Sequence, residues 1–243
     1  MELSKEDGAL LVEIARNAVR KNLGNNDISL KSTDYPDKFN EPRGVFVTIH
    51  THPDNELRGC IGFTEPVKSL FESLTEAAVL AATNDIRFPP LTKKELSKVT
   101  FEITVLSNPE PLKIKPEKYP ENIKIGRDGL IIKAVETVHH NRPSSSIWNF
   151  SVFKSGVKEW ENKEKTREIL KSGILLPQVP VEYDWDSTKF LNQVCIKAGL
   201  PATYWKTGEA RIYKFTGIIF SEKKPNNGVV KKSFSEKAKE KKE

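Results

Sequence analysis

The chain has 243 residues, of which 37% are hydrophobic, so it is long enough to bury a core as one large domain or two small ones. No segment approaches the roughly 20 apolar residues that span a bilayer, and the first residues lack the apolar stretch of a signal peptide. The sequence therefore argues against a membrane protein and leads us to expect a cytoplasmic one.

The formal charge of +6 is unevenly distributed. Residues 222–243 contain eight lysines and four glutamates, which places +4 of the total there and leaves the rest nearly neutral. Such a composition, with few apolar residues, is typical of disorder, so we predict a disordered lysine-rich tail over 222–243. No aromatic platform is interleaved in it, so a solubility role is favoured over nucleic-acid binding, and the body is not expected to bind nucleic acid.

The two cysteines, Cys60 and Cys195, are too few for a disulfide framework, and both are expected to be thiols. Cys195 fits an apolar helical stripe and is expected to be core. The four histidines have no cysteine or carboxylate at the spacing of a zinc site. We therefore predict no metal and no cofactor.

The first half of the chain alternates between helical and extended patterns. Apolar residues recur at helical spacing after the capping pair Ser4 and Asp7, and again after Thr64 and Pro66. Strands are marked by strict alternation, and one of them alternates apolar residues with threonines and Glu102, which predicts one buried face. The predicted elements are a helix over about 5–22, a hairpin of strands 45–49 and 57–63, a helix from 64–66 to about 84, and a strand over 99–105.

The second half continues with short elements and a long polar stretch. Prolines at 177 and 180 restrict their segment to an edge strand or a loop, because each removes a donor from a ladder. The predicted elements are a hairpin of 123–125 and 130–132, a helical run near 163–171, an edge strand or loop at 174–180, a helix capped by Ser187, and a strand over 211–220. Hairpins dominate, so we predict an α+β fold of mainly antiparallel sheets with packed helices.

The hexamer Leu57–Gly62 places an arginine, a thiol and two glycines inside a predicted strand. Glycine weakens a strand interior, so Gly59 and Gly62 indicate close approach of a ligand or of another backbone. In extended geometry Arg58 and Cys60 project from the same face, where the guanidinium could lower the pKa of the thiol and create a nucleophile. The alternative is a small buried thiol beside a structural ion-pair donor, because free cysteines are usually buried and inert.

Other polar residues have two interpretations each. His50 and His52 end the partner strand, where one could act as a base to the thiol, although histidines near a turn are more often surface residues. Arg87 could bind a carboxylate or phosphate, or it could pair with Asp85. Glu182 could serve in acid-base chemistry if buried, or form an exposed salt bridge.

No Walker loop, dinucleotide fingerprint, nucleophile elbow or zinc-protease motif occurs, so the common enzyme classes are unsupported. Four blocks nevertheless resemble the AMMECR domain family, and they follow one another in the family's order. These blocks are Leu57–Gly62, Asp85–Leu91, Gly173–Val179 with Glu182 and Trp185, and Cys195–Pro201.

The resemblance implies two lobes with a cleft, near which the matched residues gather. It implies one discontinuous domain over 1–221, with an insertion at about 136–172 where the family usually has a short turn. Family members are linked with MEMO-type and radical SAM proteins, which implies a functional association with both, in a macromolecule-modification pathway. The resemblance supplies no activity.

Two hypotheses follow. In the first, the chain is an enzyme or enzyme subunit in a modification pathway, with Cys60 as nucleophile or acceptor, Arg58 and Arg87 as anion anchors, and Glu182 as the acid-base candidate. In the alternative, it is a non-catalytic binding or regulatory module whose cleft holds a peptide, a nucleotide or a partner protein. The predicted ligand-binding residues are Arg58, Gly59, Gly62, Asp85, Arg87 and Gln178.

Overall fold

The computed structural model describes residues 2–139 and 166–234, which form two antiparallel sheets with packed helices and confirm the α+β class. The five-stranded sheet has the order β2-β1-β3-β8-β9, and the four-stranded sheet the order β4-β7-β5-β6. The helices are α1 (Lys5–Asn22), α2 (Leu70–Thr83), α3 (Val179–Glu182) and α4 (Ser187–Lys197). The strands are β1 (Val45–Thr51), β2 (Leu57–Phe63), β3 (Val99–Leu106), β4 (Glu110–Pro111), β5 (Gly129–His139), β6 (Thr166–Leu175), β7 (Arg211–Phe215), β8 (Gly217–Lys224) and β9 (Asn227–Ser233).

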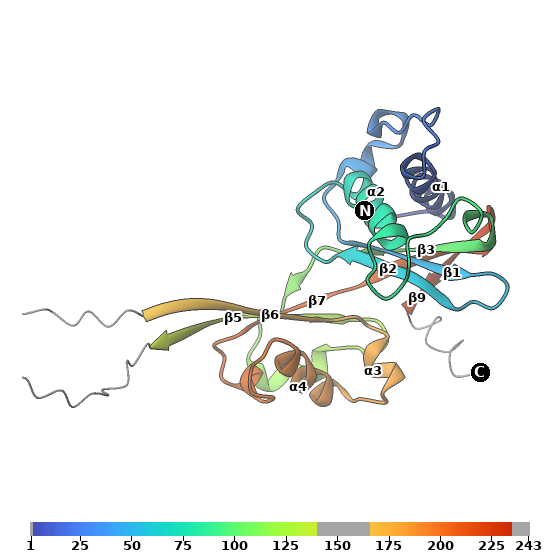
Figure 1. Ribbon diagram of the computed structural model, residues 1–243. Helices are drawn as coiled ribbons and strands as arrows, with labels where there is room; N and C mark the ends of the chain where they lie inside the picture. The colour runs from blue at the N-terminus through green and yellow to red at the C-terminus, as the bar shows by residue number, and fades with distance from the viewer. Residues whose placement is uncertain (1, 140–165, 235–243) are drawn as a thin grey trace, which may run out of the picture.

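Helices α1 and α2 cover one face of the five-stranded sheet (Figure 1). Each helix begins with a capping box, formed by Ser4 with Asp7 in α1 and by Ser69 with Glu72 in α2. Each box satisfies two backbone N–H donors at the N-terminus of its helix. The second helix therefore begins later than the predicted 64–66, because the cap at Ser69 fixes its first turn. The two apolar stripes pack on inward residues of β1 and β3, including Val47, Ile49, Phe101 and Ile103.

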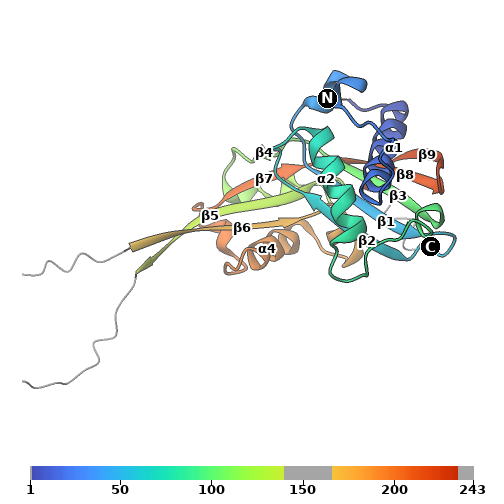
Figure 2. The ribbon, with the colours of Figure 1, turned by 45° about the horizontal axis from the view of Figure 1, so that its top comes forward.

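The four-stranded sheet is extended by β5 and β6, which pair from Leu130 with Leu175 to His139 with Thr166. Figures 1 and 2 show this pair leaving the body as a two-stranded arm, with α4 packed beside its base. The helical run predicted near 163–171 is wrong for residues 166–171, because pairing with β5 overrides the local preference of a charged segment, and residues 163–165 lie outside the described residues. The hairpin predicted at 123–132 is also wrong, since β5 pairs with β6 and β7 instead.

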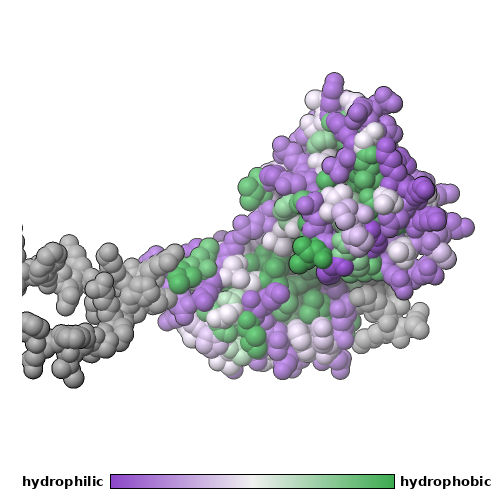
Figure 3. Space-filling model, viewed as in Figure 1, coloured by the Kyte–Doolittle hydropathy of each residue, from purple (hydrophilic) through white to green (hydrophobic). Residues whose placement is uncertain are grey.

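The chain crosses from one sheet to the other at Thr216. The strand predicted over 211–220 is divided there, with β7 in the four-stranded sheet and β8 in the five-stranded sheet. A small apolar cluster joins the two sheets, and Phe46, Phe215 and Phe234 are among its members. Figure 3 shows further apolar surface near the junction of the two sheets.

The predicted disordered tail over 222–243 is wrong for residues 222–234, which complete β8 and form β9. Strand β9 lies at the edge of its sheet and carries Lys231 and Lys232. Lysine on an edge strand discourages pairing with another chain, so the charge that suggested disorder is instead typical of an edge. Residues 235–243 lie outside the described residues. Within the described parts of the chain, none of the helices is long and apolar enough to cross a bilayer.

Candidate functional site

The hexamer forms β2, and a β-bulge near its start gives Arg58 and Cys60 different neighbours. Strand β1 pairs Ile49 with Gly59 but His50 with Leu57, so Arg58 is the extra residue. The Arg58 guanidinium binds the Glu95 carboxylate at 3.2 and 3.3 Å. The Cys60 sulfur lies instead 3.4 Å from the Thr48 hydroxyl oxygen, and the thiol is partly exposed. The two side chains therefore do not form the predicted guanidinium-thiolate pair.

Asp85 and Arg87 bind backbone groups at the free edge of β2. The Cys60 backbone N–H donates to the Asp85 carboxylate at 2.8 Å, and the Arg87 guanidinium donates to the Cys60 carbonyl at 3.4 Å. Arg87 also donates to both oxygens of Asp85, at 2.9 and 2.7 Å, and this bonding holds the pKa of Asp85 well below its usual range. Asp85 and Arg87 thus form hydrogen bonds with the Cys60 N–H and carbonyl, which could otherwise pair with another strand.

The two glycines of the hexamer are explained by packing. A Cβ atom on Gly59 would lie 2.1 Å from the Ala81 carbonyl oxygen of α2, so the helix backbone fills that space. A Cβ on Gly62 would lie 2.3 Å from the Phe46 ring of the neighbouring strand. Of the two possibilities that a strand glycine indicates, close approach of other protein atoms accounts for both positions.

The outer face of the five-stranded sheet, opposite α1 and α2, is polar. Cys60 pairs with Thr48, Thr48 with Glu102, and Glu102 with Ser221, so these four side chains form a row across the sheet. All eight residues of β3 are buried, although the alternation predicted one buried face. Glu102 is only 8% exposed, so this strand places a carboxylate where a core strand usually carries apolar side chains.

A cavity of about 500 Å³ lies on this outer face. We call it the outer-face cavity. His50 lines it, but pairs across the hairpin with Leu57 rather than with Cys60, so strand pairing does not form the predicted dyad. The cavity combines hydroxyl, amide, carboxylate, imidazole and ammonium groups. Its lining residues are Thr48, His50, Asn55, Leu57, Thr100, Phe101, Glu102, Ser221, Glu222 and Lys232.

The remaining predicted site residues, Gln178 and Glu182, lie at the two ends of α3. Gln178 precedes this short helix, and its side-chain oxygen is buried without a hydrogen-bond partner among the described residues. Glu182 ends the helix and is exposed, which removes the burial that acid-base chemistry was expected to require. Cys195 is buried in the second core as predicted, and burial raises the pKa of its thiol.

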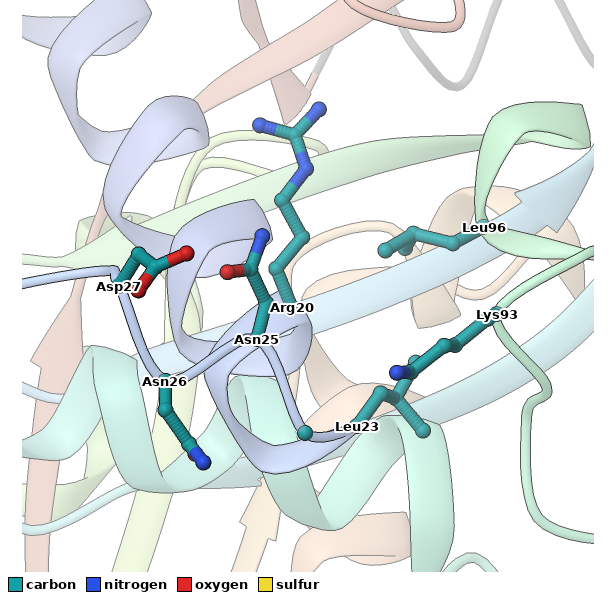
Figure 4. Close-up of a pocket in the computed structure, with 8 residues that line it drawn as sticks. Arg20, Leu23, Asn25, Asn26, Asp27, Lys93 and Leu96 are labelled. Carbon is teal, nitrogen blue, oxygen red and sulfur yellow. The ribbon is translucent and has the colours of Figure 1, made fainter.

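A second hollow of about 510 Å³ lies at the end of α1 (Figure 4). Arg20 and Lys93 line it, but the Arg20 guanidinium already binds the side-chain oxygens of Asn17 and Asn226 at 3.2 and 2.6 Å. Its lining residues lie far along the chain from the matched blocks, except for Lys93 and Leu96, which follow the block Asp85–Leu91. Across residues 2–139 and 166–234, no group of three or more histidine, cysteine, aspartate or glutamate side chains could hold a metal ion.

Sequence reasoning missed the outer-face cavity. Thr48, Thr100 and Glu102 alternate with core residues, and the same pattern describes a solvent-facing strand surface. Ser221 and Lys232 come from a region expected to end the domain or to be disordered. The one sequence feature that pointed to the cavity was Glu102, a carboxylate in the middle of β3, which is the central strand of its sheet.

Comparison with known proteins gives consistent results. The AMMECR1 family model matches residues 12–220. Protein MJ0810 of Methanocaldococcus jannaschii is 41% identical over 96% of this chain and 98% of its own length, and Protein MK0488 of Methanopyrus kandleri is 37% identical over 97% and 98%. The crystal structure of the uncharacterized protein PH0010 from Pyrococcus horikoshii is similar with a TM-score of 0.69 and 35% identity, and covers 96% of this chain and 100% of that one.

Proposed function

The chain belongs to the AMMECR1 family, and we propose that it is a binding protein whose ligand occupies the outer-face cavity. The proposal keeps the non-catalytic alternative of the two hypotheses, but it moves the ligand from a cleft between two lobes to the outer face of the five-stranded sheet. The cavity replaces the arginine-centred site expected from the sequence, because Arg58 is paired with Glu95 and Arg87 with Asp85.

The outer face of β3 carries the proposal. A strand at the centre of a sheet and buried on both sides normally gains stability by packing apolar side chains on both faces. Here the outer side chains are two threonines with Glu102 between them, and all three are at most 8% exposed. A binding role gives a physical reason for polar residues at a position where apolar ones would be more stabilising.

The lining supports a small polar ligand with both donors and acceptors. Thr48, Thr100 and Ser221 offer hydroxyls that can donate or accept, while Glu102 accepts and Lys232 donates. A volume of about 500 Å³ is within the usual range for a small-molecule site. The Cys60 thiol adjoins this cavity through Thr48.

A screen of small polar metabolites by ligand-observed NMR tests the proposal. Each hit is then titrated by calorimetry against the wild type, Glu102→Gln and Ser221→Ala. Loss of a charge-assisted hydrogen bond of about 1.5–3 kcal/mol predicts at least roughly tenfold weaker binding to Glu102→Gln. The matched control is Glu110→Gln, an exposed carboxylate on β4, which should bind as the wild type does. Hits that bind all variants equally would place the ligand elsewhere.

The second candidate is the enzyme or enzyme subunit of a macromolecule-modification pathway. The partial exposure of Cys60 beside the cavity favours it, because a reacting thiol must be reachable. In this case Cys60 reacts with iodoacetamide faster than a model thiol at neutral pH, and Cys60→Ser abolishes turnover but not ligand binding. A rate no faster than the model thiol, with binding retained in Cys60→Ser, removes this candidate. The expected association with MEMO-type and radical SAM proteins is part of this second candidate function.

A further inference from the structure

The turn between α3 and α4 presents an aromatic ring to solvent in a fixed position. Tyr183 is 65% exposed, and its ring stacks on Trp185 with centroids 5.1 Å apart and an interplanar angle of 20°. Trp185 in turn packs against the core of the four-stranded sheet. An exposed ring that is already ordered loses little conformational entropy on binding, and tyrosine is enriched at binding hot spots.

Backbone geometry fixes this turn. Asp184 has a φ of 51°, in the left-handed region, and the Trp185 N–H donates to the Pro180 carbonyl at 2.8 Å. The reversal at Asp184 brings the side chains on either side of it, Tyr183 and Trp185, into the stack. Aspartate tolerates this conformation better than most residues, and asparagine tolerates it equally well, so the charge can be removed without changing the backbone.

The segment that carries the ring has only acidic charges, in a protein whose net charge is positive. The exposed Asp184 lies between the two aromatic residues and the exposed Asp186 follows them, and no lysine or arginine lies between residues 176 and 188. The electron-rich face of a tyrosine ring attracts a guanidinium, which can pair with a carboxylate at the same time. We propose that this turn is a docking site for an arginine-bearing segment of a partner protein, with one guanidinium on the Tyr183 ring beside Asp184.

A short acetylated peptide of alternating glycine and arginine is the probe, and its citrulline counterpart, which has the same shape without charge, is the ligand control. Two-dimensional NMR on the full chain should show shifts centred on residues 182–186 for the arginine peptide alone. Binding should weaken with added salt, because these charges are exposed.

The variants separate the ring from the charge. Tyr183→Ala should weaken binding about fivefold, which corresponds to about 1 kcal/mol, whereas Tyr183→Phe retains the ring and should bind as the wild type does. Asp184→Asn should weaken binding about threefold. The matched control is Asp54→Asn, which removes the same charge from the exposed β1–β2 turn and should leave binding unchanged.

Equal weakening by Asp184→Asn and Asp54→Asn would mean that only net charge attracts the peptide, and would overturn the proposal. Unchanged affinity in Tyr183→Ala would overturn it as well, as would absence of binding at low salt. The result does not depend on whether the outer-face cavity binds a ligand, because that proposal is tested with different ligands and with variants of Glu102 and Ser221.

Discussion

The buried ion pair between Arg16 of α1 and Glu222 of β8 should be essential to the stability of this fold. The Glu222 carboxylate accepts from Arg16 at 2.7 and 2.6 Å and from the backbone N–H of Phe101 at 2.8 Å. Arg16 also donates to the carbonyls of Leu96 and Val99. The two side chains are 3% and 2% exposed, so water cannot replace a lost partner.

Replacement of Glu222 by alanine leaves the guanidinium buried without its counter-charge. Breaking a buried pair in this way costs about 3–5 kcal/mol, a large part of the roughly 5–15 kcal/mol that stabilises a typical protein. Replacement of both Arg16 and Glu222 by methionine removes both charges and should cost less than Glu222→Ala alone, because no charge remains buried without a partner.

Urea denaturation followed by circular dichroism measures both changes, provided that the slope of the free energy against urea stays constant. The control is Glu76→Ala in the exposed pair of Lys68 and Glu76, which should cost under about 1 kcal/mol. If Glu222→Ala costs no more than this surface variant, the buried pair does not stabilise the fold as argued.

Three further predictions concern the hexamer and its surroundings. Gly59→Ala should destabilise the protein by about 1–3 kcal/mol or more, since its Cβ would meet the Ala81 carbonyl, and equal thermal midpoints for variant and wild type would refute that packing. Asp85→Asn should cost about 1.5–3 kcal/mol at neutral pH. Because Arg87 lowers the pKa of Asp85, this contribution is complete above the ordinary carboxyl range and is lost as pH falls through the folded-state value, so the two stability curves should converge in acid. Native protein treated with iodoacetamide should be labelled at Cys60 and not at the buried Cys195, and mass spectrometry of peptides would reveal the opposite order.

Elements with strong local signals could be predicted from the sequence. The capping box at Ser4 and the helical stripe behind it define α1, and alternation on both sides of a turn cluster defines the β1–β2 hairpin. The prevalence of hairpin patterns was enough to predict the fold class, and the matched blocks were enough to predict the family. These signals succeed because each depends on residues that are neighbours along the chain.

The site depended on contacts between distant segments. The bulge at Arg58 directs that side chain to Glu95, and Asp85 and Arg87 bind the free edge of β2. Neither contact produces a periodic pattern in the sequence. A prediction from alternation alone therefore paired Arg58 with Cys60, whereas the bulge separates them.

Local patterns along the chain were sufficient to predict the fold class, the first helix, the β1–β2 hairpin and the family. The burial of the outer side of β3, and the cavity that Ser221 and Lys232 line together with Thr48 and Glu102, depend instead on contacts between distant segments. The reason is that alternation reports that a strand has two different faces, while the packing of other strands decides whether the polar face meets solvent or encloses a cavity.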